Sequence, residues 1–256
     1  MCEPQVADVN AVWNAHCLEA VRKFVMNAVV VDNQPVLYKK TRAQVAAIVD
    51  EGMGELVVEE VADEAITDAE NEHDLDIQKV SDAFAEQEIA CAFVFPDDGE
   101  PDEELKFRRI MAAATPSDIV ILDWFLKDGD SQLTKNVLKS IAEKDSLEKG
   151  RMRLICVYTG QPDIGEVTRD AISALKDGGL VFCNVNEQGG TAKGKHHSLL
   201  VLNKQEVVGS ELPGKILESF TGLADGLLPS FAIAAVAAVR RNMHHIIWFF
   251  RKLVAG

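Results

Sequence analysis

The stretch that decides the fold of this 256-residue chain runs from Asp118 to Gly129 and reads Asp-Ile-Val-Ile-Leu-Asp-Trp-Phe-Leu-Lys-Asp-Gly. Its residues from Ile119 to Leu122 are all apolar and end directly at Asp123. A short run rich in Ile and Val and bounded by polar residues is typical of a strand buried on both faces of a parallel sheet. The stretch therefore predicts a central strand with a carboxylate at its carboxyl end.

Similar apolar runs flank this stretch, and each of them ends in a polar cluster. They extend from Phe24 to Val31, from Ile89 to Phe95 and from Leu154 to Tyr158. Elsewhere, apolar residues recur at a spacing of three and four, which predicts helices. These helices run from Leu105 to Ala114, from Gln132 to Glu148 and from Glu166 to Leu175. Alternating strands and helices predict a doubly wound sheet, whose ligands lie beyond the carboxyl ends of the strands.

The last part of the chain adds strands and then becomes helical. Strands are predicted from Leu180 to Val185 and from Ser198 to Leu202, joined by a polar, glycine-rich stretch that favours a flexible hairpin or lid over residues 186–197. Helices are predicted from Gly214 to Phe220 and from Pro229 to Leu253. The expected fold is α/β: a doubly wound parallel five-stranded sheet with an extra hairpin and an α-helical C-terminal extension.

The predicted elements divide the chain into three regions. We expect an N-terminal helix over residues 1–23, an α/β domain over residues 24–220 and a helical extension over residues 221–256. The acidic stretch over residues 41–76 is longer than a crossover between two strands needs. It is expected to be a helical insertion or a mobile arm.

Charge and composition limit the classes of partner. The formal net charge of −15 argues against a nucleic-acid surface, which needs clustered Lys and Arg. Acidic residues dominate from Asp50 to Glu104 and basic residues from Pro213 to Gly256, so each region is either a solvated face or a docking surface.

Several features of the sequence favour a cytoplasmic protein with no membrane partner. The apolar run from Phe231 to Val239 is far shorter than the roughly 20 residues of a membrane span. The first ten residues are polar and lack the pattern of a signal peptide. Five cysteines without a CxxC pair indicate buried thiols in a reducing compartment.

Polar side chains that follow the predicted strands converge on one edge of the sheet. In chain order they are Asp32, Asn33, Asp123, Thr159 and Lys204. The segments that carry them are Val-Val-Val-Asp-Asn-Gln-Pro (29–35), the stretch 118–129, Val-Tyr-Thr-Gly (157–160) and Leu-Leu-Val-Leu-Asn-Lys (199–204). By their order and spacing these segments resemble the receiver domain of two-component response regulators, from about Phe24 to Phe220.

The resemblance implies a role for each of these residues. Asp123 would accept a phosphoryl group from a phosphohistidine, as a stoichiometric acceptor rather than an enzyme, with slow self-dephosphorylation at most. Mg²⁺ would be held by Asp32, by Asp123 and by the backbone carbonyl of Phe125. Thr159 and Lys204 would contact phosphoryl oxygens, and Gly160 would leave the phosphate approachable.

The sequence departs from the family pattern at three positions. Asn33 stands where a second acid is usual, which predicts weak Mg²⁺ binding. Gln205 replaces the proline that usually follows the lysine, so Lys193 or Lys195 could supply the charge in place of Lys204. Leu202 stands where an aromatic residue is expected.

The resemblance leaves several functions open. The expected partners are a histidine kinase or phosphotransfer protein, together with a downstream effector or a second copy bound through the C-terminal helix. The chain could signal or act as a phosphate sink in a bacterial phosphorelay, including the two-component-like systems used against phages. The alternative is a pseudo-receiver, an interaction module without phosphotransfer, which Asn33 and Gln205 favour. The pairs His196-His197 and His244-His245 predict no zinc site, because adjacent side chains diverge.

Overall fold

A computed structural model describes residues 9–36, 75–96, 102–127 and 129–254. Seven strands form the main sheet in the order β4-β1-β5-β6-β9-β8-β7, and β2 and β3 form a separate pair. The strands are β1 (Asn27–Val31), β2 (Pro35–Val36), β3 (Leu75–Asp76), β4 (Ala90–Val94), β5 (Ile119–Leu122), β6 (Arg153–Thr159), β7 (Phe182–Asn186), β8 (Thr191–Gly194) and β9 (His197–Asn203). The helices are α1 (Val9–Phe24), α2 (Ile77–Glu86), α3 (Glu103–Ala114), α4 (Gln132–Leu147), α5 (Ile164–Asp177), α6 (Leu212–Ala224), α7 (Leu227–Arg241) and α8 (Met243–Val254).

Five of the seven strands are parallel and form the core of the sheet. β1 pairs with β4 and β5, β5 with β6, and β6 with β9, all in parallel. The doubly wound α/β fold predicted from the apolar runs is therefore confirmed. The residues from Ile119 to Leu122 form the middle strand, and all four are buried.

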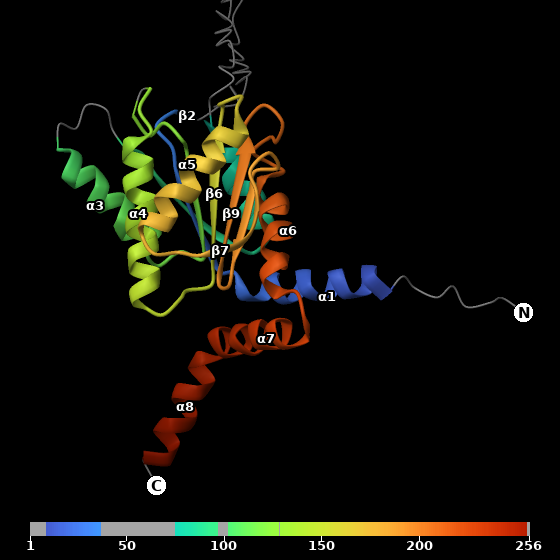
Figure 1. The fold of residues 1–256 in the computed structure, drawn as a ribbon. Helices are drawn as coiled ribbons and strands as arrows, with labels where there is room; N and C mark the ends of the chain where they lie inside the picture. Colours follow the sequence, from blue (N-terminus) through green and yellow to red (C-terminus); the bar gives the residue numbers. More distant parts are fainter. Residues whose placement is uncertain (1–8, 37–74, 97–101, 128, 255–256) are drawn as a thin grey trace, which may run out of the picture.

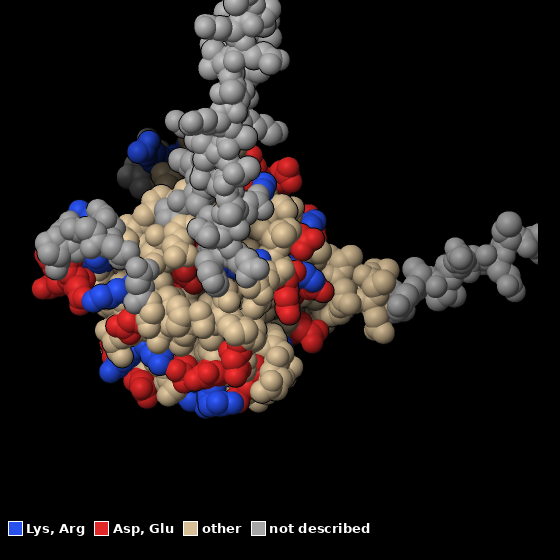
Figure 2. Space-filling model, turned by 90° about the horizontal axis from the view of Figure 1, so that it is seen from above, with Lys and Arg blue, Asp and Glu red and all other residues tan. Residues whose placement is uncertain are grey.

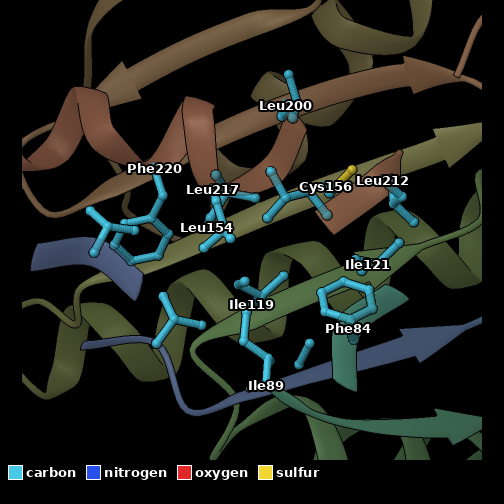
Figure 3. Close-up of a cluster of buried hydrophobic side chains, with 14 of the residues drawn as sticks. Phe84, Ile89, Ile119, Ile121, Leu154, Cys156, Leu200, Leu212, Leu217 and Phe220 are labelled. Carbon is cyan, nitrogen blue, oxygen red and sulfur yellow. The ribbon is translucent and has the colours of Figure 1, made fainter. Parts of the chain in front are cut away.

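Side chains of the strands alternate between two apolar cores, one on each face of the sheet. Ile119 and Ile121 face a core that they share with α1, α2, α6 and α7, and this core is drawn in Figure 3. Val120 and Leu122 face the opposite core, which contains residues of α3, α4 and α5. Figure 1 shows α4 and α5 on one side of the sheet and α6 on the other. Helices on both faces explain why these strands are continuously apolar.

The extra hairpin is an ordered part of the sheet. β7 and β8 pair in antiparallel fashion, and β8 pairs in antiparallel fashion with β9. The stretch 186–197 was predicted to be a flexible hairpin or lid, and it contains a strand whose Ala192 is 1% exposed. The lid interpretation is wrong, because this strand extends the sheet beyond β9.

Two predicted boundaries differ from the structure. Phe24 ends α1 and β1 begins only at Asn27, so the apolar run from Phe24 spans a helix end as well as a strand. A continuous apolar run does not distinguish the two, since both are buried. The predicted domain boundary after Phe220 lies inside α6, whose buried Leu223 and Ala224 belong to the same core as the sheet.

The helix predicted from Pro229 to Leu253 is two helices. α7 ends at Arg241, and α8 begins at Met243 after a break at Asn242. In Figure 1, α7 lies below the sheet beside α1, and α8 projects away from the body. Among the described helices, none is by itself long and apolar enough to cross a membrane; α6 and α7 together pass that test, with a bend of 118° between them.

The acidic stretch predicted as an insertion falls almost wholly outside the described residues. Of residues 41–76, the structure describes Leu75 and Asp76. They form β3, which pairs in parallel with β2. Asp76 also caps α2, because its side chain accepts a hydrogen bond from the backbone N–H of Lys79.

Candidate phosphoacceptor site

The strands bring the predicted site residues to one edge of the sheet. Val31 and Leu122 are partners in the register, so Asp32 and Asp123 follow neighbouring strands at the same level. Thr159 pairs with Asn203, which places Lys204 just beyond it. Seen from above this edge, acidic and basic side chains are interspersed around the rim of the described surface (Figure 2).

Lys204 lies between the two carboxylates. Its Nζ is 2.8 Å from Oδ2 of Asp32 and 3.4 Å from Oδ2 of Asp123. The three residues are 8% exposed or less. In the described part of the site, one cation thus offsets two buried carboxylates, and the group keeps an excess of negative charge when both are ionised.

This environment makes the Asp123 carboxylate easier to protonate. Burial raises the pKa of Asp123 to about 6, the negative charge of Asp32 acts in the same direction, and Lys204 opposes both. The backbone N–H of Trp124 also stabilises the charged form by donating to Oδ1 of Asp123 at 2.7 Å. The charged form of Asp123 is therefore destabilised in this site, and an additional cation would stabilise it.

Three hydrogen bonds fix the Asp123 backbone and side chain. Its N–H donates to the carbonyl of Val31 at 2.9 Å, which ties the end of β5 to β1. Its carbonyl accepts a hydrogen bond from the Thr134 hydroxyl of α4 at 3.0 Å. Together with the Trp124 contact, these bonds position the carboxylate before any ligand arrives.

Thr159 and Asp123 line the same small pocket, which has a volume of about 100 Å³. The Thr159 hydroxyl oxygen accepts a hydrogen bond from the N–H of Gln161 at 3.2 Å, and Thr159 is 1% exposed. Other residues that line the pocket are Asn33, Gln34, Phe125, Gly129, Gly160 and Gln161. Such a volume holds a few atoms, so it suits an ion or a phosphoryl group rather than a metabolite.

The residues present fit a divalent cation. Oδ1 of Asn33 is buried in the wall of this pocket and has no hydrogen-bond partner among the described residues, which is costly unless a ligand satisfies it. Asp123 and Phe125 share the pocket with Asn33. In the described parts of the chain no three His, Cys, Asp or Glu residues are grouped to hold a metal, so a cation here would rely on amide and carbonyl oxygens besides Asp32 and Asp123.

The structure separates Lys204 from the two lysines named as alternatives. Lys193 pairs with Ser198 near the start of β9, and Lys195 lies in the short link between β8 and β9. Both therefore lie near the amino end of β9, whereas Lys204 follows its carboxyl end. Lys204 is the lysine that contacts Asp32 and Asp123.

Two residues near the site were missed from the sequence. Tyr158 lies 5.8 Å from Nζ of Lys204, measured to its ring centre, and its hydroxyl donates to the carbonyl of Val207. The aromatic neighbour of the lysine thus comes from β6 and not from the position of Leu202. The position of Tyr158 directly before Thr159 could have indicated that it lies near the site. The second missed residue is Thr134, whose hydrogen bond to the Asp123 carbonyl has no local sequence signal.

The five parallel strands, the helices on both faces and the acidic edge define a doubly wound α/β domain with its site at the carboxyl ends of the strands. Residues 24–210, which are most of the chain, match the family described as the response receiver domain. The chain therefore belongs to that family, as its resemblance to response-regulator receivers predicted. No curated protein and no solved structure matched the chain.

Proposed function

We propose that Asp123 accepts a phosphoryl group from the phosphohistidine of a histidine kinase or phosphotransfer protein. A carboxylate oxygen of Asp123 forms a bond to phosphorus, the bond from phosphorus to the histidine nitrogen breaks, and the imidazole leaves and takes up a proton. The observation that carries the proposal is the contact of Lys204 with both Asp32 and Asp123 beside a pocket that Thr159 also lines.

Each neighbour of Asp123 has a part in this chemistry. Lys204 can move its charge from the carboxylates to a phosphoryl oxygen, since its Nζ already lies between them. The Thr159 hydroxyl can donate to a second phosphoryl oxygen, because the hydrogen bond it makes to Gln161 uses only its acceptor capacity. The hydrogen bonds of the Asp123 backbone hold its carboxylate, the nucleophile, in place.

Asp32, Asp123, the carbonyl of Phe125 and Oδ1 of Asn33 would hold Mg²⁺. When bound, this cation supplies positive charge that offsets the repulsion between the carboxylate and the phosphoryl group. The residues of the chain then act as a stoichiometric acceptor, and slow hydrolysis of the acyl phosphate returns Asp123 to its free form. A bacterial phosphorelay would use such a protein to signal or as a phosphate sink.

Incubation with acetyl phosphate and Mg²⁺ tests the proposal. Intact-mass spectrometry should show one added phosphoryl group, and Trp124 fluorescence should change in a Trp13→Phe, Trp248→Phe background, because Trp124 is buried beside Asp123. Asp123→Asn should abolish both responses. Asp177→Asn, an exposed aspartate at the end of α5, is the matched control and should retain both.

The second candidate is a pseudo-receiver that binds partners without phosphotransfer. Asn33 in place of a second acid favours it, as does the contact of Lys204 with Asp32. Under this hypothesis neither acetyl phosphate nor beryllofluoride would change the mass or the Trp124 signal, and a cognate kinase would transfer no phosphate.

A further inference from the structure

The outer surface of α7 and α8 is apolar and is left uncovered by the described residues of the chain. The exposed fractions of its large apolar side chains lie between 38% and 80%. These side chains, which we call the α7–α8 surface, are Leu227, Leu228, Phe231, Val236, Val239, Met243, Ile246, Ile247, Trp248, Phe249 and Phe250. A monomeric protein rarely leaves so many large apolar side chains of two consecutive helices in water.

Contacts with the body fix which side of α7 faces outward. Ile233 and Ala237 are buried in the core that contains α1. The Arg240 guanidinium donates to the carbonyl of Phe24 at 2.9 Å and to Oδ2 of Asp118 at 2.9 Å. Arg241 donates to the carbonyl of Lys23 at 3.1 Å. These two arginines therefore hold α7 on the body.

α8 is not packed into either core of the described chain. Every residue from Met243 to Lys252 is exposed. The helical repeat places Met243, Ile247 and Phe250 on one stripe, with His244 and Arg251 displaced to a polar side. Figure 1 shows that α8 leaves the end of α7 and does not fold back on it.

The two helices differ in the size of the side chains that they expose. The outer side of α7 carries small exposed residues, Ala232, Ala235 and Ala238, beside larger ones. α8 presents bulky Ile and Phe side chains that small residues can receive when two helices pack. Since α8 does not fold back onto α7 of the same chain, α8 of a second copy can pack there instead.

We propose that two copies of this chain exchange these helices, so that α8 of each copy packs along the outer face of α7 of the other. Such a contact is symmetric, and it closes on itself. The helices have 15 and 12 residues, which corresponds to lengths of about 22 and 18 Å. Each α8 therefore fits within the length of the α7 that receives it.

The available area meets the needs of a stable dimer. The four aromatic side chains, Phe231, Trp248, Phe249 and Phe250, are 56–71% exposed. Because an aromatic side chain presents about 150–250 Å², they alone offer roughly 400–600 Å² per copy. Together with the aliphatic members, the apolar area exposed on the two helices is comparable with the roughly 800 Å² that one partner gives to a standard interface.

Charge favours a second copy over a lipid surface. The chain has no acidic residue after Asp225, but two of its four later bases, Arg240 and Arg241, are already bound to the body. Only Arg251 and Lys252 remain on α8, fewer than the roughly four to eight clustered bases that attract anionic lipid. An anionic bilayer would also repel a chain of net charge −15. In an antiparallel contact, Arg251 and Lys252 would approach the end of the other copy's α7 that follows Asp225.

Light scattering of the full chain tests the proposal. The unchanged protein should be a dimer at micromolar concentration. Val236→Glu on α7 and Phe250→Lys on α8 should each raise the dissociation constant by about three orders of magnitude, since a core interface contact is worth about thirtyfold and each occurs twice. Leu147→Glu, on an 84% exposed leucine of α4, is the control and should remain dimeric.

Mixing the two variants tests the exchange itself. In a mixed dimer, one of the two helix contacts would pair the introduced glutamate with the introduced lysine, and the other contact would be unchanged. The mixture of Val236→Glu and Phe250→Lys should therefore form dimers that neither variant forms alone. The circular dichroism spectra of both variants should equal that of the wild-type protein, because both positions are exposed in the single chain.

The proposal would be overturned if the wild-type protein were a monomer in solution, or if it sedimented with anionic phospholipid vesicles as a monomer. A dimer without rescue in the mixture would overturn the exchange.

Discussion

Asp118 and Asp123 flank the same strand, β5, and both are buried, yet their surroundings are opposite in kind. Oδ2 of Asp118 accepts hydrogen bonds from the N–H of Met26 at 3.1 Å and from Arg240 at 2.9 Å, and the guanidinium of Arg151 lies 4.0 Å from Oδ1. Asp123 instead shares one lysine with a second carboxylate. Among the described residues, two cations serve one carboxylate at the amino end, and two carboxylates share one cation at the carboxyl end.

The difference shows that a buried aspartate can either stabilise the fold or be reactive, depending on the charges around it. An aspartate with surplus positive partners is satisfied, so it holds α7 and Met26, which directly precedes β1, to the start of β5. An aspartate beside a second buried carboxylate is less stable in its charged form, so it gains free energy when a cation or an electrophile arrives. The two ends of β5 therefore predict opposite responses to removal of the charge.

The largest expected effect is at the amino end. Asp118→Ala should lower the free energy of unfolding by about 2–4 kcal/mol, because it leaves the N–H of Met26 and the guanidinium of Arg240 without their acceptor. Urea unfolding of the variant and of the wild-type protein measures this loss of stability. The exposed Asp177→Ala should change stability by less than about 0.5 kcal/mol. An equally small loss in Asp118→Ala would mean that the arginine network does not hold α7.

At the carboxyl end the sign should reverse. Asp123→Asn should raise the free energy of unfolding by about 1–3 kcal/mol at pH 7.5 without divalent cations, because the amide removes a buried charge whose pKa is raised to about 6. The same urea titrations give this value. Destabilisation by the substitution would show that Lys204 more than compensates the burial of Asp123.

The gain from Asp123→Asn should depend on pH. The folded chain protonates Asp123 near pH 6 and the unfolded chain near 3.8, so wild-type stability from this group falls as pH rises from about 4 to 6 and is constant above. The difference between the variant and the wild type should therefore vanish near pH 4 and grow by at most about 1.4 kcal/mol per pH unit. A difference that is constant from pH 4 to 7.5 would contradict the raised pKa.

The smallest expected effect is on the affinity of the site for Mg²⁺. Asn33→Asp should tighten Mg²⁺ binding about tenfold, or roughly 1.4 kcal/mol, since a carboxylate is a better ligand than an amide. Isothermal calorimetry measures the affinity. Gln34→Glu, at a neighbouring position of the same pocket, controls for the added charge. Equal gains in both variants would show that residue 33 is not a ligand.

The sequence predicted the strands of the site because burial on both faces leaves a local signature. Ile119 to Leu122 is such a run, and Asp123 follows it at the predicted edge. The convergence of Asp32, Thr159 and Lys204 followed from the rule that parallel strands end together. These inferences needed only neighbours in the chain and the general geometry of parallel sheets.

What could not be predicted depends on contacts between distant residues. Arg240 contacts Asp118 across 122 positions in the chain, and no local pattern indicates that pairing. The same holds for the bond from Tyr158 to Val207. The break at Asn242 was also missed, because apolar residues continue at helical spacing on both sides of it.

The hairpin of β7 and β8 gives the sheet a protected margin. Without it, β9 would present unpaired backbone groups along the strand that leads to Lys204, and such an edge invites strand addition from another molecule. With it, β9 is enclosed by β6 and β8, and the outermost strand is β7. The register of β7 shifts between Phe182 and Asn184, and this irregularity makes β7 a poor template for further pairing. The hairpin thus keeps aggregation through the sheet edge away from the strand that carries the site.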